Sequence, residues 1–188
     1  MDPESRKQAI DEIKKHKKLS HPNIIKLLDS YKTNRDKLVM ITQFAEKLDL
    51  SYEIKKRKSL DNKFYTEQEI LRYFAQVCLG MKYLHDRQFC HRDIKPDNIF
   101  LTKNNIIKLG DLGVSKQMEY SEDMTSSKAG TTPYMSPECI NGKPYGKETD
   151  MWSLGIVLFE LMTLNLPFNA PTMKGIAKLI KKMNYTSV

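Results

Sequence analysis

The sequence has few cysteines that could form disulfide bonds, and it has no long apolar run that could anchor it in a membrane. It has three cysteines, Cys78, Cys90 and Cys139, with no CxxC pair among them. We interpret them as reduced thiols, which are typical of a cytosolic or nuclear protein. No apolar run reaches the roughly 18 residues that a membrane span needs, and the first residues have no signal-peptide core. We therefore expect a cytoplasmic or nuclear protein that is neither secreted nor bound to a membrane.

Charge of both signs is plentiful, and its balance is basic. The formal net charge is +8, and 40% of the residues are hydrophobic. This composition is typical of a soluble globular protein rather than a disordered one. The basic excess is concentrated at 14–18, 55–58 and 178–182, but no interleaved aromatic residues or nucleic-acid-binding motif accompanies it. We therefore expect solvated helix faces and no nucleic-acid partner.

Hydrophobic periodicity predicts a mixed fold with a small unit and a larger helical one. A helix is expected over 5–19, followed by two strands over 24–31 and 37–44. The stretch "TEQE" at 66–69 is a capping box that opens a long helix. A strand over 106–110 and a Ser/Thr-rich surface segment over 115–132 come next. The stretch at 151–164 is apolar all round, which predicts a buried helix at the centre of the larger unit.

The stretch "HRDIKPDN" at 91–98 places acids, amides and cations on one turn. Transfer of a phosphoryl group from ATP needs a group that accepts the hydroxyl proton, a cation on the phosphate and oxygen ligands for Mg²⁺. Asp93, Lys95 and Asn98 provide these three kinds of group. Asp111, in "GDLG", adds a carboxylate at the end of the predicted strand. The pattern therefore favours phosphoryl transfer.

Five motifs in order give the chain a resemblance to eukaryotic protein kinases. They are "HPNIIKLLDSY", "HRDIKPDN", "GDLG", "GTTPYMSPE" and "DMWSLGIVLFELMTLNLPF". Lys95 resembles the serine/threonine branch, and "DRQFCHRDIKPDNIFLT" is similar to the NIMA-related (NEK) group. The resemblance implies an α+β fold with a partial small lobe over 1–45, built from helix C and two strands. It also implies a mainly helical large lobe over 46–188 that lacks the family's last helices.

The resemblance implies ATP and Mg²⁺ as cofactors and protein Ser/Thr hydroxyls as substrates. By the resemblance, Asp93 is the proton-accepting base, Lys95 contacts the γ-phosphate, and Asn98 and Asp111 bind Mg²⁺. The residues implied in nucleotide binding are Thr42 as gatekeeper, Gln43 to Ala45 at the adenine, Asp49 and Asp97 near the ribose, and Phe100 under the base, together with Lys95, Asn98 and Asp111.

Regulatory residues are also implied by the resemblance. Arg92 is expected to pair with a phosphorylated Ser127, and Thr131 to bridge Asp93 and Lys95. Glu12 matches the helix-C glutamate. The resemblance further implies that Asp150 caps the catalytic loop from the central helix.

Two motifs of the family do not occur in this sequence. There is no GxGxxG stretch and nothing like VAIK, so we expect an incomplete nucleotide site in which activity is doubtful. A non-catalytic pseudokinase scaffold is therefore the alternative function. A small-molecule kinase of the aminoglycoside type fits less well, because "SPE" and an activation segment are present. The sequence does not indicate an oligomeric state.

Overall fold

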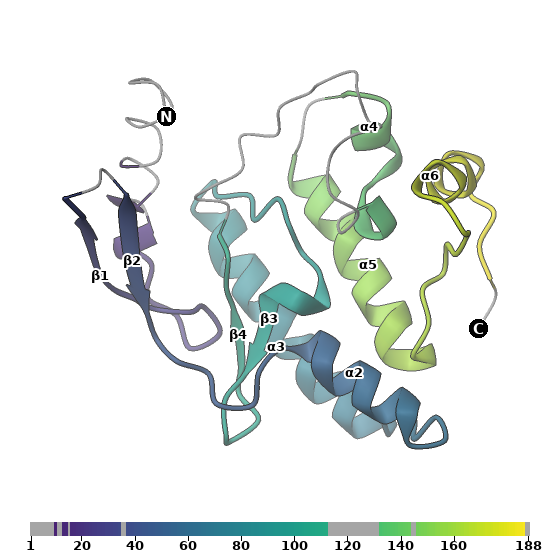
Figure 1. The fold of residues 1–188 in the computed structure, drawn as a ribbon, viewed down its shortest axis with the longest axis horizontal. Helices are drawn as coiled ribbons and strands as arrows, with labels where there is room; N and C mark the ends of the chain where they lie inside the picture. The colour runs from purple at the N-terminus through teal and green to yellow at the C-terminus, as the bar shows by residue number, and fades with distance from the viewer. Residues whose placement is uncertain are drawn as a thin grey trace.

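The computed structural model describes residues 10, 13–14, 16–34, 37–112, 132–143 and 146–186. These residues form two small sheets and a larger body of helices (Figure 1). None of the helices in these ranges combines the length and apolar character needed to cross a bilayer. The elements are β1 (Leu27–Lys32), β2 (Leu38–Thr42), α2 (Leu50–Ser59), α3 (Glu67–Asp86), η1 (Pro96–Asn98), β3 (Ile99–Leu101), β4 (Ile107–Leu109), η2 (Thr132–Tyr134), α4 (Pro137–Ile140), α5 (Lys147–Thr163) and α6 (Met173–Lys182).

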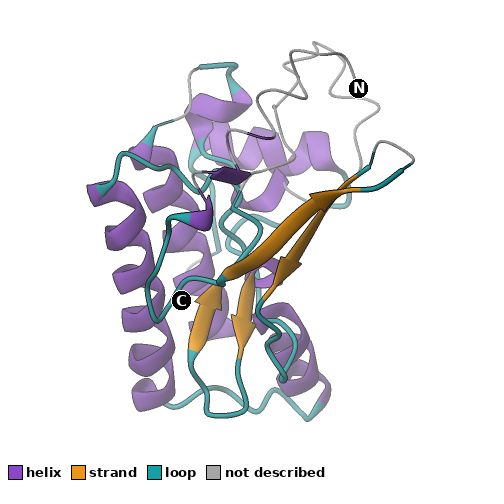
Figure 2. Ribbon diagram, turned by 90° about the vertical axis from the view of Figure 1, so that its left-hand side faces the viewer, coloured by secondary structure: helices purple, strands orange, loops and turns teal. Residues whose placement is uncertain are grey.

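The first sheet is an antiparallel hairpin of β1 and β2. Ser30 pairs with Met40 at its centre, and the register shifts between Leu27 and Asp29. Both strands were predicted, but each is shorter than the apolar stretch that predicted it. Figure 2 shows the hairpin projecting from the helical body. Its two faces are largely exposed, since most side chains of both strands remain in contact with solvent.

The chain just before β1 joins the hairpin to the body. The backbone N–H of Ile25 donates to Leu109 O at 2.7 Å, and Leu109 N–H donates back to Asn23 O at 2.8 Å. The Asn23 side chain adds a bond from Nδ2 to Ile107 O at 3.0 Å. Residues 23–25 therefore run beside β4, and this pairing positions the hairpin above the large helical body.

Helix α3 begins where its capping box predicted. Thr66 Oγ1 accepts from Glu69 N–H, and the Glu69 carboxylate accepts from Thr66 N–H at 2.8 Å. The helix turns Val77 and Leu84 into the core, and neither has any exposed surface. Gly80 lies so close to β4 that a Cβ atom there would come within 2.8 Å of the Leu109 side chain. The helix backbone thus packs directly on β4.

Helix α5 is the predicted buried helix at the centre of the body. It begins at Lys147, before the predicted start at 151, because polar residues of the first turn belong to the helix as well. Leu154, Val157 and Leu161 are buried in the core that α5 shares with α3. It ends at Thr163, and the C-cap residue Leu164 has a left-handed φ of 57°.

Helices α2, α4 and α6 were not predicted. Helix α2 buries only Leu50 and Ile54 among its apolar residues, and α6 buries Ile176 and Ile180. These four apolar side chains all belong to the same core cluster. Ile13 and Leu19, from the predicted first helix, are also buried. The division into lobes at residue 45 stays a prediction.

Candidate active site

The turn after α3 brings three predicted site residues into contact. Lys95 Nζ donates to Asp93 Oδ2 at 2.8 Å, and Asn98 Nδ2 donates to the same oxygen at 2.9 Å. Asn98 Nδ2 also donates to Asp93 O at 2.7 Å. The 3-10 turn η1 returns the chain toward Asp93, because Pro96 starts it and Asn98 N–H donates to Lys95 O at 3.0 Å. Asp93 and Asn98 are 7% and 6% exposed, so their geometry is held by packing as well as by hydrogen bonds.

The second predicted carboxylate, Asp111, follows the strand that pairs with this turn. Strands β3 and β4 are antiparallel, with Ile99 opposite Leu109. The next residue, Gly110, donates from its N–H to Asn98 O at 3.0 Å. Asp111 therefore lies next to the turn formed by residues 91–98, which is called the catalytic turn here after the role predicted for Asp93. Asp111 has an exposed side chain and a left-handed φ of 49°.

Gly110 permits the close approach of the Phe100 side chain. A Cβ atom at this position would lie 2.5 Å from Phe100 Cε2 and 3.4 Å from Ile25 Cγ2. Real Cβ atoms essentially never show a contact as short as 2.5 Å, so a larger residue would displace the Phe100 ring. Glycine here lets Phe100 cover the strand end that precedes Asp111.

Negative charge concentrates around the buried ring of His91. Complete burial lowers the pKa of His91 below its ordinary value, while the carboxylates of Asp150, Asp93 and Asp111 each raise it. The net effect favours the neutral ring.

Among the described residues, no group of three or more His, Cys, Asp or Glu side chains is arranged to hold a metal ion. Asn98 is not one of those types, and an amide that donates through Nδ2 has its Oδ1 to offer to a hard cation. One amide and one carboxylate fit Mg²⁺ when phosphate oxygens supply further ligands.

Asp150, at the start of α5, holds the chain that leads into the catalytic turn. Its carboxylate accepts from the N–H groups of His91 and Arg92, each at 2.9 Å. The Nε2 atom of His85 lies 2.8 Å from Asp150 Oδ2. The predicted capping role of Asp150 is confirmed, while the contact with His85 was not predicted because it carries no local sequence signal.

The residues predicted to bind adenine and ribose lie on the connection from β2 to α2 and on the catalytic turn. Thr42 ends β2 with an exposed side chain, and Gln43 N–H donates to Lys26 O at 2.8 Å. Ala45 is half-buried, and Asp97 is exposed in η1. Among the described residues, no hydrogen bond or ion pair joins the Thr42 side chain to the catalytic turn.

Asp49 and Phe100 are brought together. They form an isolated antiparallel bridge, and Asp49 also caps α2 by accepting from Tyr52 N–H at 2.8 Å. The bridge places the start of α2 beside β3. Asp49 therefore has a structural role in starting the helix, in addition to the ribose contact predicted for it.

A buried tyrosine–glutamate pair near the turn was not predicted as a pair. Tyr134 Oη donates to Glu160 Oε2 at 2.6 Å. Burial raises the pKa of Tyr134, and the Glu160 carboxylate raises it further. Burial also raises the pKa of Glu160, and the charge of Asp97 adds to this effect. The negative charge of Asp97, in η1, therefore raises the pKa of both members of the pair.

The glutamate of "SPE" has a local partner on α5. Thr149 Oγ1 donates to Glu138 Oε1 at 3.0 Å. Burial alone would raise the pKa of Glu138, but hydrogen bonds from its own backbone, Ser136 and Thr149 bring it below the ordinary value. Ser136 also caps α4 by accepting from Cys139 N–H. These bonds attach the segment that follows η2 to the first turn of α5.

The predicted regulatory residues are only partly covered by the structure. Arg92 is exposed, with a left-handed φ of 70°. Glu12, Ser127 and Thr131 lie outside the described residues, as does the predicted surface segment apart from its last residue.

Comparison with known proteins finds relatives over nearly the whole chain. The model of the protein kinase domain matches residues 1–187. A putative serine/threonine-protein kinase A of Trypanosoma brucei brucei is 38% identical over 187 residues, which cover 98% of this chain and 43% of that protein. Human serine/threonine-protein kinase Nek5 is 37% identical over 172 residues, which cover 91% of this chain and 24% of that protein. Probable serine/threonine-protein kinase nek3 of Dictyostelium discoideum is 41% identical over 192 residues, covering 100% and 17%. The chain therefore spans less than half the length of these relatives.

Proposed function

Because this chain belongs to the protein kinase family and is similar to serine/threonine kinases of the NEK type, we propose that it transfers the γ-phosphate of ATP to a serine or threonine hydroxyl of a protein. The observation that carries the proposal is the contact of Lys95 Nζ and Asn98 Nδ2 with one oxygen of Asp93, at 2.8 and 2.9 Å. A base, a cation and an amide within one hydrogen-bonded group are the parts that this reaction requires of its protein.

Asp93 acts as the proton acceptor in this proposal. Its side chain is 7% exposed and is held by two donors, so it is oriented before substrate arrives. Orientation of this kind contributes to the rate because the substrate hydroxyl meets the base at a fixed place. Lys95 Nζ lies 2.8 Å from Asp93 Oδ2, and we assign Lys95 to the transferring phosphate, where it offsets negative charge.

Mg²⁺ and ATP are expected from the family. Residues of this chain that match the family's motifs are assigned as the groups that would bind them. When bound, Mg²⁺ would neutralise the phosphate oxygens during transfer. Asn98 and Asp111 would supply protein oxygens to it. The connection after β2, with Thr42, Gln43 and Ala45, would contact the adenine. Asp49 and Asp97 would lie near the ribose, and Phe100 would cover one face of the base.

Regulation by phosphorylation belongs to the same proposal. Arg92 is exposed beside the proposed base, where a phosphate on Ser127 would attract its guanidinium. Thr131 would bridge Asp93 and Lys95, and Glu12 would serve as the helix-C glutamate.

The experiment measures ATP binding and phosphate transfer separately. The purified chain is titrated with ATP in the presence of Mg²⁺ and then assayed on a mixture of peptides with Ser or Thr acceptors. Asp93→Asn should lower turnover by about 10²–10⁴-fold, because the amide cannot accept the hydroxyl proton. Its unfolding midpoint should match that of the unchanged chain.

Asp86→Asn is the matched control. Asp86 is exposed at the end of α3 and pairs with Lys82 away from the proposed site, so turnover should be unchanged. Turnover that survives in Asp93→Asn would exclude Asp93 as the base. A chain that binds no nucleotide and transfers no phosphate would favour the scaffold alternative.

A further inference from the structure

His85 lies where the ends of α3 and α5 meet. It is in the last turn of α3, and its Nε2 atom lies 2.8 Å from Oδ2 of Asp150, in the first turn of α5. Because an ionised carboxylate can only accept a hydrogen bond, Nε2 carries the hydrogen and donates it. The two residues are 65 apart in the sequence. Their contact therefore depends on the packing of α3 against α5.

The Asp150 carboxylate is completely buried, so protein groups must replace the water around it. The N–H of His91 donates to Oδ2 and the N–H of Arg92 donates to Oδ1, each at 2.9 Å. His85 adds a third donor, at Oδ2. A buried carboxylate is costly unless hydrogen bonds and positive charge compensate for the lost water. Of these three donors, His85 is the one that can also carry a positive charge.

The polarity of the contact matches the two helix ends that it joins. Partial negative charge gathers at the C-terminal end of a helix, here α3, and partial positive charge gathers at the N-terminal end, here α5. A hydrogen-bond donor at the first end and a carboxylate at the second match these partial charges. The side chain of His85 is 15% exposed, whereas that of Asp150 has no exposed surface. The contact therefore shields Asp150 on the side of α3.

Asp150 passes this support to the backbone that precedes the proposed base. It holds the N–H groups of residues 91 and 92, and Asp93 follows directly. The N–H of Asp93 itself lies 3.4 Å from Nδ1 of His91, a long hydrogen bond that gives little support of its own. A shift of the Asp150 carboxylate would therefore move the backbone from which the Asp93 side chain extends.

We propose that His85 is a positioning residue for Asp93 and acts through Asp150. By donating to Oδ2, His85 fixes the carboxylate that holds the backbone of residues 91 and 92, and this backbone directs the Asp93 side chain. His85 contacts neither nucleotide nor substrate in this role. Its effect on phosphate transfer rests on the proposed function, whereas its effect on the turn does not.

Hydrogen exchange of the backbone N–H groups of His91 and Arg92 measures the effect on the turn without nucleotide. The unchanged whole chain is compared with His85→Leu and His85→Gln. Leucine has an apolar side chain that cannot donate, so the two N–H groups should exchange on the order of tenfold faster. The amide of glutamine offers an N–H group near the place of Nε2. It should restore exchange to within about threefold of the unchanged chain.

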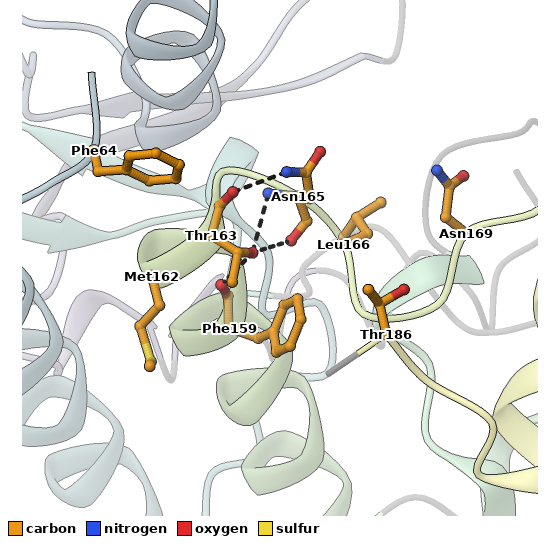
Figure 3. A pocket seen from close by; sticks show the side chains of 8 residues that line it. All are labelled: Phe64, Phe159, Met162, Thr163, Asn165, Leu166, Asn169 and Thr186. Atoms are coloured by element: carbon orange, nitrogen blue, oxygen red, sulfur yellow. Dashed lines mark hydrogen bonds between the residues drawn. The ribbon is translucent and has the colours of Figure 1, made fainter. Parts of the chain in front are cut away.

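One control substitution on each helix removes a hydrogen bond elsewhere. Lys82→Leu removes the donor to Asp86, in an exposed pair on α3. Thr163→Val acts at the opposite end of α5, where Thr163 Oγ1 donates to Phe159 O at 2.8 Å (Figure 3). Neither substitution changes one of the three donors to Asp150 described above. Both should leave the exchange of the two N–H groups within about twofold.

Asp150→Asn tests whether the effect passes through the carboxylate. In this background, His85→Leu should change the exchange of the Arg92 N–H by no more than about twofold, because the charge that His85 helps to compensate is absent. A tenfold effect in both backgrounds would show that His85 acts by packing alone and would overturn the proposal. Unchanged exchange in His85→Leu, or no recovery in His85→Gln, would overturn it too. If His85→Leu does not fold, His85→Asn replaces it, because its shorter amide does not reach Asp150.

Kinetic measurements test the part that rests on the proposed function. His85→Leu should lower kcat on the order of tenfold, with KM for ATP within about twofold, because the direction of Asp93 changes and the nucleotide contacts do not. His85→Gln should recover kcat. A kcat that is unaltered in His85→Leu would reject the positioning role and leave the proposed function standing. A chain that transfers no phosphate would reject the proposed function, while hydrogen exchange still decides whether His85 holds the turn.

Discussion

The backbone N–H of Arg92 donates to Asp150 Oδ1 at 2.9 Å across 58 residues of sequence. Arg92 has a φ of 70°, a conformation that non-glycine residues seldom adopt without support. Asp150 is completely buried at the first turn of α5, so the bond is shielded from water. The central helix therefore holds the unusual backbone turn that presents Asp93.

Asp150→Asn should weaken this support. An amide keeps the shape of the carboxylate but can accept at only one of its two positions, so a buried N–H group of the turn loses its partner. We expect the free energy of unfolding to fall by about 1–3 kcal/mol, measured by urea denaturation. Asp86→Asn, at an exposed ion pair on α3, should leave the unfolding midpoint unchanged. Equal midpoints for the two variants would mean that the turn does not depend on Asp150.

Gly110→Ala should disturb the proposed nucleotide site. The added methyl group would lie 2.5 Å from Phe100 Cε2, so the ring must move or the strand end must shift. We expect a loss of stability of about 1–3 kcal/mol and weaker ATP binding in the same titration.

Gly155→Ala is the matched control, because nothing lies within 4 Å of a Cβ atom at that position of α5. An exposed helical glycine replaced by alanine should raise stability by about 1 kcal/mol. If Gly110→Ala were as stable as the control, the close approach of Phe100 would not constrain this position.

The Tyr134–Glu160 pair should make stability depend on pH. The folded-state pKa of Glu160 is raised above the ordinary 4.5, mainly by burial. Between pH 4.5 and that raised value, the folded chain binds more protons than the unfolded chain, so the free energy of unfolding falls as pH rises. Glu160→Gln still accepts from Tyr134 but cannot ionise, and it should remove this decline in urea titrations across the window.

Glu67→Gln, at the exposed start of α3, serves as the control and should keep the decline. A Glu160→Gln profile parallel to that of the unchanged chain would show that Glu160 ionises as easily in the folded state as in the unfolded one.

Thr149→Val should loosen the segment attached to α5. The hydroxyl donates to Glu138 and accepts from Gly146 N–H at 3.3 Å, and valine can do neither. We expect a loss of about 1–3 kcal/mol at neutral pH. The pKa of Glu138 is lowered in the folded state, so its stabilising effect is present above pH 4.5 and is lost as pH falls through the folded value. The penalty of Thr149→Val should therefore shrink on acidification, and a constant penalty would contradict the role of Glu138.

Local signals in the sequence predicted the elements that depend on them. The capping box at 66–69 and the apolar spacing after it predicted α3, and the all-apolar stretch predicted α5. Helix α2 was missed because only Leu50 and Ile54 of its apolar residues are buried, which leaves a stripe too narrow to give a periodic pattern. The start of α2 depends on the Asp49 cap. Only the structure shows the hydrogen bond from Tyr52 N–H that makes Asp49 the capping residue.

The sequence by itself determined the group formed by Asp93, Lys95 and Asn98, because these residues lie within one turn and their contacts follow from local backbone geometry. Only the tertiary structure decided the bond from Arg92 to Asp150, the pairing of Tyr134 with Glu160 and the contact of Lys58 with Asn165, which spans 107 residues. Such contacts depend on how helices pack around a shared core, and no spacing of residue types along the chain records that packing.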